Sequence, residues 1–130
     1  MTAQAQDVGL TGLRVLVVED SLLVADMIAE LLEDAGVTVV GPVGRVPAAL
    51  ALAEREALDG ALLDVNLAGQ HSGPIAAALH TRGIPFIFLT GYSDAGALPA
   101  EFRDMPQMAK PFRQRDLEAR MVKSFRPGQA

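Results

Sequence analysis

The sequence predicts an α/β fold in which helices cover both faces of an open, doubly wound parallel sheet. Three observations support this prediction. Short runs rich in Val, Leu and Ile alternate with longer segments of helical period, the loops between them are short, and Gly or Pro marks most boundaries. With 130 residues, the chain has room for one domain of ordinary size. We therefore expect a single domain with right-handed crossovers.

The first strand and the first helix have the clearest patterns. Residues 14–18 are nearly continuously apolar, as expected for a strand buried on both faces of a parallel sheet. From Ser21 the period becomes helical, with Asp20 or Ser21 as the cap and Gly36 at the end. The apolar residues of this helix form two adjacent rows, one of Val24, Ile28 and Leu32 and one of Leu23, Met27 and Leu31.

The second and third strands are separated by another helix. Residues 37–40 form an apolar strand that is closed by Gly41-Pro42, and residues 47–57 have a helical period. Residues 60–63 form a third strand that runs into Asp64. The predicted inner face of the intervening helix consists of Leu50, Ala53 and Ala57.

The carboxyl-terminal half continues the alternation. Pro74 suits the first turn of a helix that Gly83 ends, and residues 84–89 form a fourth strand. Residues 91–106 carry the weakest pattern and leave room only for a short helix, before a minimal fifth strand at residues 107–109. A last helix spans about residues 113–125, with an apolar row of Leu117, Met121 and Phe125.

Composition excludes several classes of function. The chain has 11 basic and 16 acidic residues and a net charge of −5, which disfavours direct binding to nucleic acid. It contains no cysteine, so disulfides, thiolate metal sites and a cysteine nucleophile are excluded. No apolar run is long enough for a membrane span, and residues 1–12 lack the features of a signal peptide. We expect a cytoplasmic protein with a folded domain over residues 12–126 and flexible ends at 1–11 and 127–130.

Polar residues follow four of the predicted strands. In the flavodoxin-like (βα)5 sheet, with strand order 2-1-3-4-5, Glu19-Asp20, Asp64, Thr90 and Lys110 would share the carboxyl rim where ligands bind. Three close carboxylates favour a hard cation such as Mg²⁺, which oxygen ligands and a backbone carbonyl can hold. Thr90 and Lys110 would then face a tetrahedral anion on Asp64, and the small Gly91 would let its backbone N–H approach that anion. This pattern describes an aspartate that can be phosphorylated.

Glu19-Asp20, Asp64, Thr90 and Lys110-Pro111, in this order and at these strand ends, resemble the receiver domain of two-component response regulators. The resemblance implies that Asp64 accepts a phosphoryl group from a histidine kinase or a phosphotransfer protein. Asp20, Asp64 and the backbone of Asn66 would bind Mg²⁺, with Glu19 acting through water. Thr90 would be the switch hydroxyl, Gly91 would donate its backbone N–H to the phosphate, and Lys110 would pair with the phosphate. Lys110-Pro111 would be a cis peptide.

One position departs from the usual receiver pattern. Gln107 stands where most receivers carry an aromatic residue in the fifth strand, and Tyr92 is the nearest substitute. The segment from Pro85 to Tyr92 resembles the FATGUY group of receivers, with Leu89 at the position of that group's alanine. Members of the group are often single domains that lack this aromatic residue. The resemblance implies a kinase of the HWE or HisKA2 type.

Three functions follow in order of preference. The first is a single-domain response regulator, a monomer or weak dimer, that signals through an unknown downstream protein or passes its phosphoryl group onward. The second is an adaptor with a receiver fold that acts without phosphorylation, which only Gln107 favours. The third is a Mg²⁺-dependent aspartyl phosphohydrolase, which Asn66 disfavours, because such enzymes carry a second aspartate two residues after the nucleophile.

Overall fold

The computed structural model describes residues 9–67, 69–91 and 105–126 of the chain. These residues build a parallel sheet of five strands in the order β2-β1-β3-β6-β7. Since β4 and β5 form a separate antiparallel hairpin, this is the predicted order 2-1-3-4-5. The strands are β1 (Arg14–Val18), β2 (Thr38–Val43), β3 (Gly60–Asp64), β4 (Asn66–Leu67), β5 (Gln70–His71), β6 (Phe86–Thr90) and β7 (Gln107–Ala109). The helices within the described residues are α2 (Leu22–Asp34), α3 (Val46–Arg55), α4 (Gly73–Thr81) and α5 (Gln114–Phe125).

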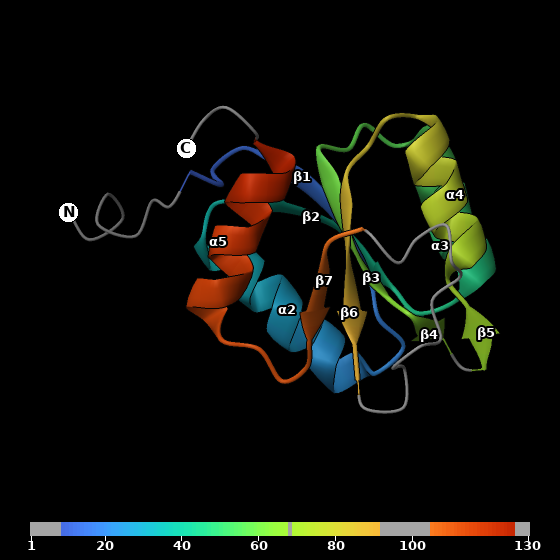
Figure 1. Cartoon of the computed structure of the whole chain (residues 1–130), viewed down its shortest axis with the longest axis horizontal. Coiled ribbons are helices and arrows are strands. Elements are labelled where there is room, and N and C mark those ends of the chain that lie inside the picture. Colours follow the sequence, from blue (N-terminus) through green and yellow to red (C-terminus); the bar gives the residue numbers. More distant parts are fainter. Residues whose placement is uncertain (1–8, 68, 92–104, 127–130) are drawn as a thin grey trace.

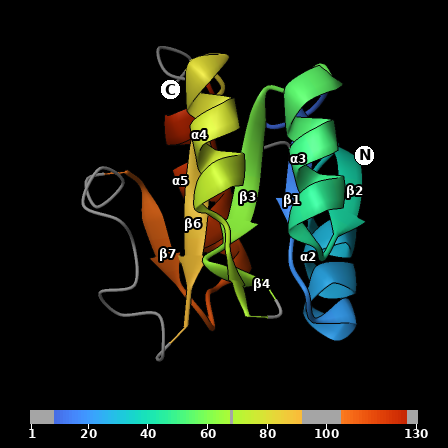
Figure 2. The ribbon, with the colours of Figure 1, turned by 90° about the vertical axis from the view of Figure 1, so that its right-hand side faces the viewer.

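Helices cover both faces of the sheet, α2 and α5 one face and α3 and α4 the other (Figure 1). Figure 2 shows α3 and α4 side by side in front of the strands. Side chains that alternate along each strand supply the two cores. In β1, Val15 and Val17 pack in the core beneath α2 and α5, whereas Leu16 and Val18 pack in the core beneath α3 and α4. Burial on both faces explains why the strands are continuously apolar in the sequence.

The first and last helices agree with their predicted patterns. Ser21 is the cap of α2, and its side chain accepts a hydrogen bond from the backbone N–H of Val24 at 3.4 Å. Gly36, just after the helix, has a φ of 88°, a value that favours glycine. The predicted inner row of α5 is buried, namely Leu117, Met121 and Phe125.

Three predicted boundaries were wrong. β2 continues through Gly41-Pro42 to Val43, because β1 shifts its pairing register there and keeps the strand attached.

α3 ends at Arg55 and buries the small residues Ala49 and Ala53, which allows close packing against α4 and the sheet. The predicted inner residues Leu50 and Ala57 are half-buried and exposed, respectively. β6 begins at Phe86 instead of residue 84, since Pro85 has no N–H to give to a strand ladder.

The ends of the domain and the weakly patterned segment are described only in part. Leu10 is fully buried in the core beneath α2 and α5, so that core includes a residue upstream of the predicted domain of residues 12–126. Residues 92–104, which include Tyr92 and most of the predicted short fourth helix, lie outside the described residues, as do residues 1–8 and 127–130. None of the described helices has the length and apolar character needed to cross a bilayer.

Candidate functional site

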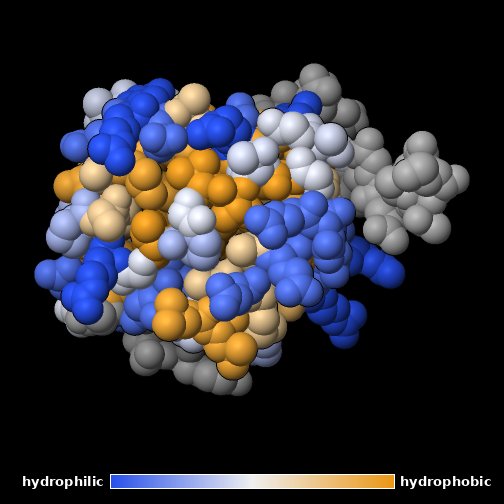
Figure 3. Space-filling view, turned by 180° about the vertical axis from the view of Figure 1, so that it is seen from behind, coloured by the Kyte–Doolittle hydropathy of each residue, from blue (hydrophilic) through white to orange (hydrophobic). Residues whose placement is uncertain are grey.

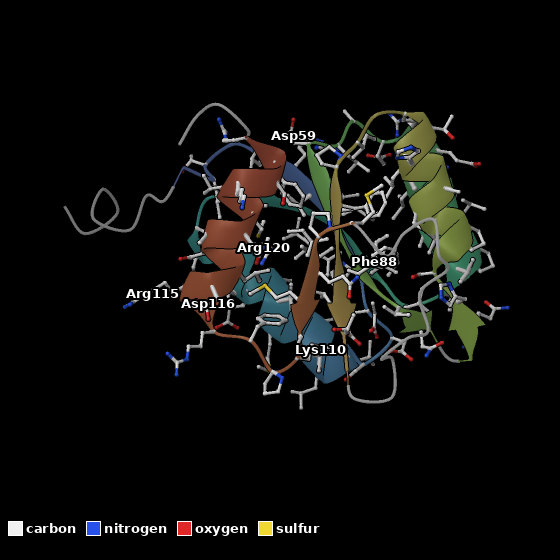
Figure 4. All side chains as sticks on the ribbon, viewed as in Figure 1. Asp59, Phe88, Lys110, Arg115, Asp116 and Arg120 are labelled. Carbon is white, nitrogen blue, oxygen red and sulfur yellow. The ribbon has the colours of Figure 1, made fainter. Side chains whose placement is uncertain are left out.

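The sheet brings the predicted polar residues together at the carboxyl ends of its strands. Glu19 and Asp20 follow β1, Asp64 ends β3, and Lys110 follows β7 at the lower end of the sheet in Figure 4. Glu19, Asp20 and Asp64 each offer an oxygen atom, and these atoms lie within 4.8 Å of one another. The convergence expected from strand order is therefore present, although the residues are up to 91 positions apart in the sequence.

Lys110 joins the two buried carboxylates. Its Nζ lies 3.1 Å from Glu19 Oε1 and 3.2 Å from Asp64 Oδ1. The Glu19 and Asp64 residues are only 3% and 5% exposed, whereas Asp20 is exposed to solvent. Among the described groups around the site, three carboxylates thus face one ammonium. The remaining negative charge makes a divalent cation a good electrostatic match.

Burial and neighbouring charges change the acidity of this site. Burial, and next the charge of Glu19, raise the pKa of Asp64 from 3.8 to about 7, although Lys110 acts in the opposite direction. Burial alone lowers the pKa of Lys110, but the hydrogen bond to Glu19 and the charges of both acids outweigh burial and raise that pKa. The ammonium therefore stays charged. The Asp64 carboxyl would become more acidic beside a bound cation.

Backbone contacts hold the loop after β1, which carries Glu19 and Asp20, in place. The N–H of Glu19 donates to the Val43 carbonyl at 2.9 Å, and the N–H of Ser21 donates to Glu19 Oε2 at 3.1 Å. Gly44 packs directly against this loop, since a Cβ added to Gly44 would lie 3.1 Å from the Asp20 Cα and 3.2 Å from the Glu19 carbonyl oxygen. Sequence reasoning missed the supporting role of Gly44. The only available signal was a glycine just after the second strand.

The predicted switch residues lie next to the cluster of Glu19, Asp20 and Asp64, which we call the acidic group. Thr90 ends β6, and its hydroxyl donates to the Met108 carbonyl of neighbouring β7 at 3.5 Å. The Lys110 N–H donates to the Thr90 carbonyl at 2.7 Å, which links the two strand ends. Gly91 follows at once and is half-buried. The predicted cis peptide at Lys110-Pro111 is present, and a second one joins Gly41 to Pro42.

A small hairpin follows Asp64 along the chain. Asn66 is exposed at the start of β4, two residues after Asp64, while Leu67 is buried. The Ser72 N–H donates to the Val65 carbonyl at 3.0 Å and closes the base of the hairpin. The hairpin therefore has a buried anchor in Leu67, and Asn66 follows Asp64 by two residues. The oxygen donors of Glu19, Asp20 and Asp64 fit Mg²⁺, which uses one or two carboxylates and retains waters.

Comparison with known proteins agrees with this geometry. The family description "Response regulator receiver domain" matches residues 15–122, which include Glu19, Asp20, Asp64 and Lys110. The chain belongs to this family. As a receiver domain it is a signalling domain of two-component systems, with the flavodoxin-like fold described above.

Similar proteins are found among solved structures and curated sequences. The receiver shares 42% identity with SdrG from Sphingomonas melonis, with a TM-score of 0.76 and coverage of 85% of this chain and 93% of SdrG. It shares 29% identity with the response regulator PhyR from Brucella abortus, with a TM-score of 0.76 and coverage of 95% and 52% of the two chains. A transcriptional regulatory protein of Bacillus subtilis, YbdJ, is 30% identical over 113 residues. The match spans 85% of this receiver but 49% of YbdJ, about half of that curated relative.

A magnesium-bound structure provides a comparison at the level of the fold. The receiver domain of a sensor histidine kinase from Pseudomonas aeruginosa, with a magnesium ion in its active site cleft, has a TM-score of 0.77 and 24% identity. The alignment covers 88% of this chain and 98% of that domain. Receiver domains bind Mg²⁺ in an acidic pocket, and this receiver has a cluster of three acids, Glu19, Asp20 and Asp64, whose oxygen atoms could hold a metal ion.

Proposed function

We propose that this receiver accepts a phosphoryl group on Asp64 from a histidine kinase or phosphotransfer protein in a Mg²⁺-dependent reaction. The observation that carries the proposal is the ion pair of Lys110 with both Glu19 and Asp64 at the rim of the sheet. A lysine at 3.2 Å from the accepting carboxylate can neutralise charge on an incoming phosphoryl group. A phosphoacceptor needs this charge neutralisation together with a positioned nucleophile.

In the proposed reaction, a carboxylate oxygen of Asp64 forms a P–O bond as the P–N bond to the donor histidine breaks. The electron pair of the broken bond returns to the imidazole, which then takes a proton from solvent. Asp64 is well placed because β3 and its neighbours fix the backbone on both sides. The product is an acyl phosphate in contact with the Lys110 ammonium.

Magnesium would be held by Asp20, by Asp64 and by the backbone carbonyl of Asn66, with Glu19 acting through water. When bound, the ion supplies positive charge at the transferring phosphoryl oxygens. The described residues position the acids and offset their charge. Gly44 and the Val43 carbonyl hold the loop that carries Glu19 and Asp20, and Lys110 offsets the charge of the buried acids.

The phosphoryl group would act as a switch through Thr90 and Gly91. The Thr90 hydroxyl now lies near the Met108 carbonyl, a weak contact at 3.5 Å that a phosphoryl oxygen can replace. Gly91 would donate its backbone N–H to the same anion. SdrG, which is 42% identical, has a BeF₃-activated conformation, and this likeness supports switching in the present chain.

The proposed pathway is that of the FATGUY group, with a kinase of the HWE or HisKA2 type as donor. The exposed Gln107 of β7 supports this assignment, because it stands where most receivers have an aromatic residue. We place the protein in the cytoplasm, as a monomer or weak dimer over residues 12–126. It would signal through contacts with a downstream protein or by onward phosphotransfer. A panel of purified kinases tests the donor, and preference for an unrelated kinase type would contradict the subgroup.

The core of the proposal is tested with a small phosphodonor. The receiver is incubated with acetyl phosphate with and without Mg²⁺, and intact mass spectrometry counts the added phosphoryl groups. We expect one group on the wild-type protein with Mg²⁺ and none on Asp64→Ala. Asp116→Ala, an exposed acid of α5, is the matched control and should be labelled normally. Full labelling of Asp64→Ala would overturn the assignment.

A further inference from the structure

The hairpin of β4 and β5 is held to the domain by few apolar contacts. It has two residues in each strand, and an isolated hairpin of this size is at best marginally stable in water. Leu67 is buried, whereas Asn66 and Gln70 are exposed. In the rear view of Figure 3, the lower left side, where the hairpin lies after the half turn from Figure 1, is mostly hydrophilic. The exposed large apolar side chains of the described residues lie elsewhere, on α2: Leu22, Leu23 and Met27. Polar contacts must therefore help to hold the hairpin in place.

His71 makes a contact that closes the hairpin onto α4. Its Nδ1 atom accepts a hydrogen bond from the backbone N–H of Gly73 at 2.9 Å. Gly73 is the first residue of α4, so the imidazole satisfies one of the backbone donors that have no partner inside the helix. The residue at the usual cap position, Ser72, does not do this, because its buried hydroxyl makes no hydrogen bond within the described residues. The imidazole of His71 thus takes the place of a helix cap.

The lack of a side chain at Gly73 lets the imidazole approach. A Cβ added to Gly73 would lie 3.2 Å from Nδ1 and 3.8 Å from Cε1 of His71. The first distance is shorter than an ordinary van der Waals contact, so a larger residue would push the ring away from the start of the helix. The contact therefore depends on both residues, with His71 as the acceptor and Gly73 as a donor that leaves room for the ring.

The register of the hairpin places His71 opposite Asn66. The two residues are partners in the antiparallel pairing of β4 with β5. The next pair along the hairpin carries the hydrogen bond from the Ser72 N–H to the Val65 carbonyl at 3.0 Å. Because hydrogen-bonded and non-hydrogen-bonded pairs alternate in an antiparallel ladder, Asn66 and His71 form the closely spaced pair whose backbone groups point away from each other. The Asn66 carbonyl is thus directed away from β5, and its position depends on where the hairpin holds His71.

We propose that His71 is a positioning residue for the Mg²⁺ site, and that its hydrogen bond with Gly73 fixes the Asn66 backbone where the ion can use it. This rests on the proposed function, which assigns the Asn66 carbonyl to Mg²⁺. His71 itself contacts neither the ion nor the phosphoryl group. Groups that orient a metal ligand are typically worth about 10–100-fold in metal affinity. Since the carboxylates stay in place, we expect the lower end of that range, about tenfold.

The test measures Mg²⁺ affinity by NMR titration of the whole receiver, through the amide signals of residues 64–66. His71→Ala removes the acceptor and should raise the dissociation constant about tenfold. His71→Asn should bind nearly as tightly as wild type, because an Asn side chain also accepts from the N–H two residues further along. His80→Ala, which removes an exposed histidine of α4, is the matched control and should leave the affinity unchanged.

Gly73→Ala tests the same contact from its other side. The added Cβ should raise the dissociation constant in the otherwise wild-type protein, because it displaces the imidazole. In the His71→Ala background the same change should add no further loss, since the contact is already absent. Independent effects of the two substitutions would overturn the shared contact as their cause.

A second readout separates positioning from a general loss of stability. Acetyl phosphate labelling is followed at increasing Mg²⁺ concentrations. His71→Ala should need about tenfold more Mg²⁺ for half-maximal labelling but reach nearly the wild-type rate at saturation, because Asp64 and Lys110 are unchanged. A substitution that only weakened the fold would lower the urea midpoint in EDTA and leave the dissociation constant for Mg²⁺ unchanged.

Failure of this proposal can be distinguished from failure of the proposed function. A folded His71→Ala that binds Mg²⁺ as tightly as wild type would overturn the role of His71 and leave phosphorylation of Asp64 intact. A His71→Asn as weak as His71→Ala would overturn the hydrogen bond to Gly73 as the cause. If His71→Ala does not fold, Gly73→Ala decides, and wild-type affinity in that variant would overturn the proposal. Absence of both Mg²⁺ binding and labelling in wild type would instead refute the proposed function, and this proposal with it.

Discussion

Replacing Asp64 by Asn should stabilise the metal-free protein, and increasingly so as the pH rises. The carboxyl is 5% exposed, and burial together with Glu19 raises its pKa from 3.8 to about 7. Between these pH values the unfolded chain releases its proton while the folded protein retains it. The folded state then binds more protons, so its stability falls as the pH increases. Asn has a similar shape and carries no charge, so the variant lacks this loss.

The size of the effect follows from the pKa shift. A shift from 3.8 to about 7 amounts to about 4 kcal/mol above both values, since one pKa unit is worth about 1.4 kcal/mol. At pH 5 only about 1–2 kcal/mol of this loss is present. Wild type should therefore lose about 2–3 kcal/mol relative to Asp64→Asn between pH 5 and pH 8. Lys110 keeps its partner Glu19 at 3.1 Å in the variant, so no unpaired ammonium offsets the gain.

Urea unfolding at pH 5, 6, 7 and 8 in excess EDTA measures this difference. Subtracting the two free energies of unfolding at each pH removes the contributions of the titrating groups that do not interact with Asp64. Asp116→Asn, which removes an exposed charge from α5, is the control. A difference between wild type and Asp64→Asn that stays constant from pH 5 to pH 8 would refute the reasoning. Such a result would mean that burial does not hold the proton on Asp64.

Three further predictions concern the metal, a helix cap and a close contact. Mg²⁺ at ten times its dissociation constant should stabilise the wild-type protein by about 1.4 kcal/mol in urea unfolding, and this gain should largely disappear in Asp20→Asn. An equal gain in both proteins would place the ion elsewhere. Ser21→Ala should lower the free energy of unfolding by about 1 kcal/mol, because the helix loses its side-chain cap, whereas Ser21→Asp should retain stability. Gly60→Ala should destabilise the fold by about 1–3 kcal/mol, since its Cβ would lie 2.6 Å from the Phe125 ring. Phe125→Leu in the Gly60→Ala background should recover part of that loss in thermal unfolding, and no recovery would mean that the ring is not the obstacle.

Strand and helix identity could be predicted from the sequence because each element carries its own period. The continuous apolar run of β1 and the row of Leu117, Met121 and Phe125 in α5 are local signals. The predicted ends of helices and strands agreed less well with the structure where packing against a distant part of the chain determines them. β2 extends past Gly41-Pro42 only because β1 supplies a paired edge, and α3 turns its small alanines inward because α4 packs beside it. The sequence around such positions contains no local pattern that indicates which element packs against them.

The sequence predicted that polar residues meet at one edge of the sheet, as Glu19, Asp64 and Lys110 do, but it did not predict the contacts that support them. Parallel strands end at one edge of a sheet, so acids and a lysine placed just after strands must meet there. The close approach of Gly44 to Asp20 depends on how the loop after β2 packs against the loop after β1, and no residue type predicts that packing. The exposed row of Leu23 and Met27 is similar, since its period fits a core as well as a surface.

The order of the elements, the two-sided burial of the sheet and the polar residues at its carboxyl edge can be read from the sequence, because local period and strand ends encode them. The bridge from Lys110 to Glu19 and Asp64, and the exposure of Leu23 and Met27 on α2, depend instead on how the elements pack. Packing of the helices on the whole sheet sets the distances between residues that are far apart in the chain. It also determines which side of a helix is buried. They are therefore properties of the fold, which no single segment contains.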